Sequence, residues 1–283
     1  MIGIFDSGFG GLTILRSIRR HLPQYDYLYL GDNARTPYGT RSFEVVYEYT
    51  LQAVQYLFAQ GCHLIILACN TASAKALRSI QQRDLPLLWQ REGSSLKRVL
   101  GVIRPTVEAI GGYTHTGHVG VLATPGTVSS GSYPIEIGKL YPDICVTQQA
   151  CPMWVPLIEN NEHGNAGADW FVQKYVHEIL QKDAAIDTLL LACTHYPLLE
   201  EKIRRVTPAG VRLLSQGDIV ARSLEDYLMR HAGLERTCTQ GATCRYLTTE
   251  SEERFAASAA IFTGTPVTAR HIELGSGAAG SLR

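Results

Sequence analysis

The chain has 283 residues, which is enough for one large domain or for two ordinary domains with separate cores. Its 26 basic and 26 acidic side chains cancel, so no broad electrostatic field favours nucleic acid or an anionic membrane surface. No apolar run approaches the roughly 20 residues of a membrane span, and no basic leader precedes the first apolar segment. We therefore expect a cytoplasmic protein that acts on a small molecule, with no nucleic-acid or membrane partner.

Short apolar runs alternate with longer helical patterns from the start of the chain. This alternation is typical of a mostly parallel sheet covered by helices on both faces, so we predict an α/β fold. In chain order the predicted strands are Ile2–Phe5, Tyr27–Leu30, His63–Ala68, Val99–Ile103, His118–Leu122, Ile144–Gln148, Thr188–Ala192, Val211–Leu214 and Cys244–Leu247. Apolar residues three and four positions apart predict helices at Gly10–His21, Phe43–Gln60, Ser73–Gln82, Thr106–Gly111, Val128–Leu140, Asp169–Gln181, Leu198–Arg205, Ile219–His231 and Glu252–Ile261.

One apolar run that ends in cysteine occurs twice. Leu64–Thr71 reads LIILACNT, and Leu189–His195 reads LLLACTH. A looser echo links Ile2–Gly8 to Val119–Gly126. The simplest cause is a duplicated unit, so we predict two similar parallel-sheet α/β lobes related by a pseudo-twofold axis. Equivalent strand ends would then place one cysteine on each side of an interlobe cleft, where we expect the active site.

The repeat also predicts how the chain divides. Residues 1–97 plus 208–265 would form the first lobe, and residues 98–207 the second. The chain would cross between the lobes near Lys97 and Thr207, a hinge-like arrangement that makes the crevice the natural binding place. The glycine- and serine-rich end predicts a flexible tail over residues 266–283.

The cysteine pattern argues against a metal or disulfide framework. Seven cysteines are present, an odd number without any CxxC pair. This is typical neither of a disulfide scaffold nor of a zinc ribbon, and we expect no metal site. We interpret five as ordinary buried or half-buried thiols: Cys62, Cys145, Cys151, Cys238 and Cys244.

The two repeated cysteines, Cys69 and Cys193, each follow a predicted strand and precede a predicted helix. Lowering a thiol pKa from about 8.5 to about 7 needs roughly 2 kcal/mol, whereas a helix terminus offers about 0.3–1 kcal/mol. A cation or hydrogen-bond donors must supply the rest, and His195 is a candidate beside Cys193. The alternative is that both cysteines are purely structural residues at the ends of buried strands. Their matched positions in the repeat make this alternative less favourable.

Polar residues follow the same strands. Asp6-Ser7-Gly8 lacks the lysine of a phosphate-binding loop, and Asp6 would repel a phosphate; it could instead accept a proton, hold an ammonium group or cap the next helix. Asn70, Thr71 and Thr194 bring donors that suit a carboxylate, although the threonines could equally be helix caps. The Pro37–Gly39 turn could direct backbone N–H groups into the cleft.

Four motifs together resemble one known family. They are Asp6-Ser7-Gly8-x-Gly10-Gly11, Pro37-Tyr38-Gly39, Ala68–Ser73 and Leu191–Pro197, in this order along about residues 1 to 262. The chain resembles the glutamate racemases, members of the cofactor-independent aspartate/glutamate racemase superfamily. The resemblance implies two lobes that close on glutamate and interconvert its L and D forms without pyridoxal phosphate or metal, supplying the D-isomer for peptidoglycan.

The resemblance also implies roles for individual residues. Cys69 and Cys193 would be the acid/base pair. Asp6 would support the first thiol, and His195 and Glu159 the second. The implied substrate contacts are Asp6, Ser7, Tyr38, Gly39, Asn70, Thr71, Thr127, Thr194 and His195.

Other functions stay open at this point. Aspartate or another acidic amino acid is the nearest competing substrate, because one carbon of side-chain length is worth only about 1–3 kcal/mol in a pocket. A two-lobed amino-acid binding protein would use the same cleft, and a cysteine hydrolase or lyase could use Cys193 with His195. The sequence does not fix the oligomeric state; a homodimer is the expectation. One departure from the family pattern, Arg104-Pro-Thr106, lies at the predicted lobe crossing and bears on the hinge rather than on the thiols.

Overall fold

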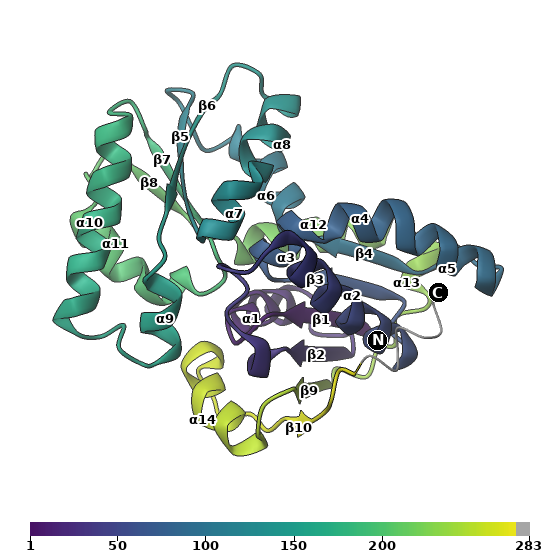
Figure 1. Cartoon of the computed structure of the whole chain (residues 1–283). Coiled ribbons are helices and arrows are strands. Elements are labelled where there is room, and N and C mark those ends of the chain that lie inside the picture. Colours follow the sequence, from purple (N-terminus) through teal and green to yellow (C-terminus); the bar gives the residue numbers. More distant parts are fainter. Residues whose placement is uncertain (276–283) are drawn as a thin grey trace.

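A computed structural model describes residues 1–275 and contains two parallel sheets. The first sheet has the strand order β10-β9-β2-β1-β3-β4 (Figure 1). Its strands are β1 (Ile2–Asp6), β2 (Tyr27–Gly31), β3 (Leu64–Leu67), β4 (Arg98–Gly101), β9 (Cys244–Thr248) and β10 (Arg270–His271). The second sheet has the order β6-β5-β7-β8 and contains β5 (His118–Ala123), β6 (Cys145–Ala150), β7 (Thr188–Ala192) and β8 (Arg212–Leu214).

Helices cover both faces of each sheet. The first sheet carries α1 (Gly11–His21), η1 (Asn33–Arg35), α2 (Phe43–Ala59), α3 (Asn70–Lys75), α4 (Leu77–Ser79), the π-helix η2 (Ile80–Asp84), α5 (Leu85–Glu92), α12 (Gly217–Arg230), α13 (Ala232–Glu235) and α14 (Glu252–Thr263). The second sheet carries α6 (Ile103–Ile110), α7 (Pro125–Ser130), α8 (Ser132–Leu140), α9 (Trp154–Glu159), α10 (Ala166–Lys182), η3 (Tyr196–Leu199) and α11 (Glu200–Val206).

Alternation along the strands explains why both faces are covered. Successive side chains of a strand point to opposite faces, and every residue of β1 is buried. Ile2 and Ile4 pack in the core beneath α1 and α12, whereas Phe5 packs in the core beneath α2. The strands therefore read as continuous apolar runs, as is usual for parallel sheets buried on both sides.

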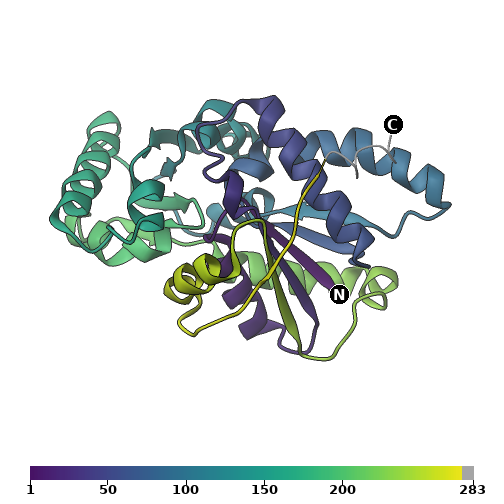
Figure 2. The same ribbon diagram turned by 60° about the horizontal axis from the view of Figure 1, so that its bottom comes forward.

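The two sheets share one topology, which confirms the predicted fold class. The order β2-β1-β3-β4 of the first sheet matches β6-β5-β7-β8 of the second, strand for strand in chain order. The first sheet adds β9 beside β2 and β10 beside β9, so the chain around residues 270–272 forms this edge (Figure 2). Both sequence repeats lie on equivalent strands of the two sheets, because β1 corresponds to β5 and β3 to β7.

The strand pairings differ from the predicted division at both crossings. β4 pairs with β3 and stays in the first sheet, although residues 98–207 were assigned to the second lobe. β8 pairs with β7 in the second sheet, although the return to the first lobe was placed at residue 208. The sequence repeat covers only the first and third strand of each unit, so it placed each crossing before the fourth strand. The chain crosses near Val102 and Gln216 instead.

The predicted tail and some helices also need correction. β10 pairs with β9, and the N–H of Ile272 donates to the carbonyl of Thr248 at 2.8 Å, so residues 266–275 include an edge strand of the first sheet. Positions 276–283 of the predicted tail lie outside the described residues. The sequence patterns missed α5, α9 and α13. Within residues 1–275, no helix combines the length and apolarity needed to cross a membrane.

Candidate active site

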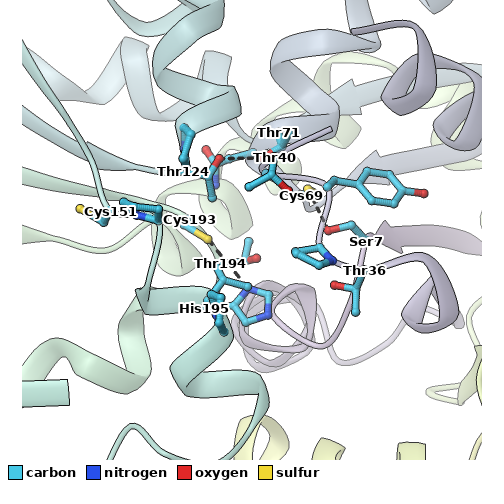
Figure 3. Close-up of a pocket in the computed structure, with 18 residues that line it drawn as sticks. Ser7, Thr36, Thr40, Cys69, Thr71, Thr124, Cys151, Cys193, Thr194 and His195 are labelled. Carbon is cyan, nitrogen blue, oxygen red and sulfur yellow. Dashed lines mark hydrogen bonds between the residues drawn. The ribbon is translucent and has the colours of Figure 1, made fainter. Parts of the chain in front are cut away.

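Both repeated cysteines line one cavity between the lobes. Figure 3 shows the sulfurs of Cys69 and Cys193 entering it from opposite sides, with Ser7 near the first and His195 near the second. The cavity lies where the carboxyl ends of β1 and β3 face those of β5 and β7. Its lining residues are Ser7, Thr36, Pro37, Tyr38, Gly39, Thr40, Cys69, Asn70, Thr71, Thr124, Pro125, Cys151, Pro152, Val155, Pro156, Cys193, Thr194 and His195.

Cys69 lies at the start of α3, and its hydrogen-bond partners are neutral groups. Its sulfur caps the helix by accepting from the N–H of Ala72 at 3.4 Å, and the hydroxyl of Ser7 lies 3.3 Å away. Burial and the nearby carboxylate of Asp6 raise the pKa of the Cys69 thiol to about 12, although both hydrogen bonds act in the opposite direction. In this closed cavity Cys69 therefore holds its proton at neutral pH.

Asp6 lies behind Cys69 rather than in the cavity lining. It is the last residue of β1 and fully buried, and its carboxylate accepts from the N–H of Gly8 at 3.0 Å and from the Thr194 hydroxyl at 3.5 Å. Burial raises the pKa of the Asp6 carboxyl, while the positive charge of His195 lowers it. The sequence predicted a substrate contact here as well, but the cavity lining does not include Asp6.

Cys193 directly follows β7 and has a histidine partner. Its sulfur lies 3.8 Å from Nδ1 of His195, whose Nε2 lies 2.7 Å from Oε1 of Glu159 at the end of α9. Burial lowers the pKa of His195, but hydrogen bonds to Cys193 and Glu159 outweigh it and raise this pKa well above its usual value. A protonated imidazole beside a sulfur stabilises the thiolate form. Glu159 supports the pair from outside the cavity lining.

The glycines after β1 leave room for these second-lobe side chains. A Cβ at Gly8 would lie 2.6 Å from Oε1 of Glu159, and one at Gly10 would collide with His195 and Thr194. A side chain at Gly8 would displace the Glu159 carboxylate, and one at Gly10 would displace His195 and Thr194. The glycine-rich loop therefore serves close contact between lobes and not the binding of a phosphate.

Threonines and one main-chain bond join the lobes at another part of the cavity. The Thr71 hydroxyl lies 2.9 Å from that of Thr124 and 3.4 Å from that of Thr127. The N–H of Gly126 donates to the carbonyl of Gly39 at 2.7 Å. Thr127 lies behind Thr124 and outside the cavity lining, although a substrate contact was predicted for it.

Three further predicted contacts line the cavity but are engaged elsewhere. The Tyr38 hydroxyl donates to the buried carboxylate of Asp32, so its ring and not its hydroxyl faces the site. The Thr194 carbonyl accepts from the Thr13 hydroxyl at 2.9 Å. Asn70 bonds through both amide atoms to neighbours outside the cavity lining.

Several cavity residues had no sequence prediction. Thr36 and Thr40 flank the Pro37–Gly39 turn, and Cys151 was interpreted as an ordinary thiol although it lines the cavity. Asp32, which holds the Tyr38 hydroxyl from outside the lining, was missed as well, although it directly follows β2 and Asp6 ends the neighbouring strand β1. Its position after a strand was the available signal, because carboxyl ends of neighbouring parallel strands meet at one edge.

One group of side chains in the described part of the chain could hold a metal ion, and it lies away from the cavity. The ligand atoms of His118, Cys145 and Asp183 lie within 4.8 Å of one another. His118 and Cys145 begin β5 and β6, whereas the cavity lies at the other ends of the strands. His118 Nδ1 already pairs with Asp183 Oδ2 at 2.8 Å.

The arrangement suits proton transfer at a tetrahedral carbon. The sulfurs of Cys69 and Cys193 lie on opposite sides of the cavity (Figure 3), so a ligand held between them would present one face to each. One sulfur lies beside a protonated histidine, and the other keeps its proton. Such a site could supply one base and one acid on opposite sides of the same space.

Comparison with known proteins gives a consistent assignment. The family model described as Asp/Glu/Hydantoin racemase matches residues 12–224. A glutamate racemase of Streptococcus gordonii is 38% identical over 276 residues, which cover 96% of this chain and 98% of the relative.

Solved structures agree with this result. A glutamate racemase from Bacillus anthracis superimposes with a TM-score of 0.85 at 33% identity and covers 97% of each chain. One from Francisella tularensis, in complex with D-glutamate, has a TM-score of 0.81 at 30% identity and covers 97% of this chain and 98% of its own. The family match spans well over half of the residues, so the chain belongs to the Asp/Glu/Hydantoin racemase family.

Proposed function

We propose that this protein is a glutamate racemase that interconverts L- and D-glutamate by proton transfer between two cysteines, without a cofactor. One observation supports the two-cysteine step above all others: equivalent strand ends of a duplicated fold bring Cys69 and Cys193 to one cavity. The substrate is inferred from the relatives, which are glutamate racemases, one of them in complex with D-glutamate.

In the proposed reaction, Cys193 as thiolate removes the Cα proton from one enantiomer. The C–H bond breaks, an S–H bond forms, and the electron pair stays on the substrate as a planar carbanion. Cys69 then gives its proton to the opposite face, so its S–H bond breaks and a new C–H bond forms. The other enantiomer reacts in the reverse sense, with Cys69 as the base.

The residues around the sulfurs have proposed supporting roles. His195 and Glu159 stabilise the thiolate at Cys193. Burial and the Asp6 carboxylate hold the proton at Cys69, and the Ser7 hydroxyl stabilises the thiolate when Cys69 acts as the base. Neutral donors from the side chains of Ser7, Asn70 and Thr71 and from the main-chain N–H of Thr194 would hold the substrate carboxylates and stabilise charge that develops on the α-carboxylate. Burial of the cavity keeps out water, which would otherwise compete as a proton source.

The cellular setting follows from the substrate. We infer that the enzyme supplies D-glutamate for peptidoglycan and works in the cytoplasm, where we expect a homodimer. The homodimer is an expectation from the family resemblance and has no part in the proposed chemistry.

The test follows optical rotation and deuterium uptake at Cα in deuterated water, with L- and D-glutamate beside L- and D-aspartate and no added cofactor. We expect racemisation of glutamate with one solvent deuteron in each product molecule. Cys69→Ala and Cys193→Ala should each abolish turnover, whereas Cys62→Ala, a buried cysteine of the first lobe outside the cavity, should keep it.

Each alternative function has its own outcome in this experiment. Faster turnover of aspartate than of glutamate would identify aspartate as the preferred substrate. Glutamate binding without Cα exchange would identify a binding protein. Hydrolase or lyase activity that survives Cys69→Ala but not Cys193→Ala would select the cysteine enzyme that uses His195.

A further inference from the structure

A ring of buried polar side chains lies directly behind Asn70, at the junction of the two lobes. The side chains of Asn70, Tyr133 and Gln216 are at most 2% exposed. Asn70 Nδ2 donates to Gln216 Oε1 at 2.6 Å, Gln216 Nε2 donates to the Tyr133 oxygen at 2.8 Å, and the Tyr133 hydroxyl donates to Asn70 Oδ1 at 2.7 Å. Each member gives one hydrogen bond and accepts one.

The ring joins both lobes and both chain crossings. Asn70 begins α3 of the first lobe directly after Cys69, and Tyr133 belongs to α8 of the second. Gln216 precedes α12, where the chain returns from β8 to the first lobe. Helices α3, α6 and α12 pack together at this junction (Figure 1).

Taken alone, the ring could run in either direction. If both amides turned over and the tyrosine hydroxyl rotated, every member would again donate once and accept once. Asn70 would then present its carbonyl oxygen where its N–H₂ group now lies. The three side chains of the ring therefore do not determine the orientation of Asn70.

Two acceptors outside the ring determine the direction. The Thr106 hydroxyl donates to the carbonyl of Val102 at 2.8 Å, which leaves its lone pairs available to Gln216. The Gln216 amide lies 2.9 Å from the Thr106 oxygen and 3.4 Å from the Val102 carbonyl. The carbonyl has no proton to donate, and Thr106 could donate to Gln216 only by giving up its bond to that carbonyl. The group nearest them must be the N–H₂ group, which leaves Oε1 to accept from Asn70.

We propose that Thr106 and Gln216 are positioning residues of the catalytic cavity, which hold the Asn70 amide with its N–H₂ group in a fixed orientation. The ring uses one of the two hydrogens on Asn70 Nδ2, so a second N–H is free for a substrate carboxylate at the cavity where Asn70 lies. This role rests on the proposed racemase function. Thr106 also belongs to the segment that departs from the family pattern.

The decisive comparison is between two threonines. Thr106 and Thr50 are both fully buried in helices, and each donates its hydroxyl to the carbonyl four residues earlier, at 2.8 and 2.7 Å. Thr50 lies on α2 and does not contact the ring. Thr106→Val and Thr50→Val therefore remove the same local hydrogen bond, but only the first removes the acceptor that orients Gln216.

We expect Thr106→Val to raise KM for both glutamate enantiomers about threefold to tenfold, with a smaller change in kcat, because one buried hydrogen bond is lost. Gln216→Leu should lower kcat/KM by about tenfold or more, since Asn70 loses its partner. Thr106→Ser should restore KM, and Thr50→Val should leave KM and kcat unchanged. Calorimetric binding of D-glutamate, which needs no turnover, should weaken in parallel with the rise in KM.

Equal kinetics for Thr106→Val and Thr50→Val would overturn the proposal, and so would failure of Thr106→Ser to restore KM. Thermal unfolding checks that each variant is folded. If Gln216→Leu does not fold, the comparison of Thr106→Val with Thr50→Val still tests the proposal. Absence of racemisation in the wild-type protein would argue against the proposed function, while the binding measurement would still test the ring.

Discussion

The two lobes offer the substrate the same scaffold but different chemistry. Cys69 and Cys193 follow equivalent strands of sheets with the same strand order. Cys69 has neutral partners and a buried carboxylate behind it, whereas Cys193 has a histidine that Glu159 keeps protonated. Duplication thus explains where the two sulfurs are, and the residues that diverged afterwards explain their unequal electrostatic surroundings.

This inequality suits an enzyme that needs one acid and one base at a time. Two thiols or two thiolates could not complete the reaction in either direction. The free enantiomers have equal free energies in water, so kcat/KM must be equal for both at every pH. The asymmetry of the lobes can therefore appear only in kcat and KM taken separately.

The largest effect should come from removing the cation beside Cys193. His195→Asn should lower kcat/KM by about a hundredfold or more, as expected when a group that controls a catalytic proton is lost. In the wild-type protein near pH 7, iodoacetamide should alkylate Cys193 before Cys69, and the variant should lose this preference. Mass spectrometry of the alkylated peptides measures it, with His177→Asn on the exposed face of α10 as control. Preferential alkylation of Cys69 in the wild-type protein would reverse the proposed assignment.

A smaller effect should follow from neutralising the residue behind His195. Glu159→Gln keeps an acceptor for Nε2 but removes the charge, so kcat/KM should fall roughly tenfold. Glu159 helps to raise the pKa of His195, so the imidazolium of the variant should lose its proton at lower pH. The alkaline limb of the kcat/KM profile should therefore move to lower pH. Glu162→Gln, an exposed neighbour, is the control, and an unchanged alkaline limb in Glu159→Gln would contradict the link.

The smallest effect concerns stability on the Cys69 side. Burial raises the pKa of Asp6 above 3.8, so its charged form opposes folding at neutral pH. Asp6→Asn should raise Tm near pH 7 by a few degrees, and the gain should shrink as pH falls toward 3.8, where the unfolded chain also becomes protonated. Racemisation should decline in the same variant. A lower Tm near pH 7 would mean that the hydrogen bonds of Asp6 outweigh the burial of its charge.

The sequence predicted the features that depend on local pattern. All nine predicted strands are present, and the repeated run placed Cys69 and Cys193 at equivalent ends because strand periodicity and duplication can be read along the chain. β10 was missed because its two residues show no alternation. Helix α9 was missed although it carries Glu159, since six residues around Pro156 give too short an amphipathic pattern.

Long-range contacts could not be predicted from local sequence patterns. No local pattern brings Gln216 to Asn70, or the Tyr38 hydroxyl to Asp32, because these pairs form only once the chain crossings are known. The predicted crossings were each one strand too early, which hid Gln216 from the sequence argument. Thr127 and Asp6 were predicted as substrate contacts by family resemblance, and the structure places both behind the lining of the cavity.

The join between Gly39, Thr71 and the second lobe has a consequence for substrate exchange. Its hydrogen bonds link neutral groups, and each is worth only about 0.5–1.5 kcal/mol when water can replace the partner. Ions in solution screen contacts between charges but weaken hydrogen bonds between neutral groups very little. Opening of this join should therefore proceed at nearly the same rate in dilute and in concentrated salt.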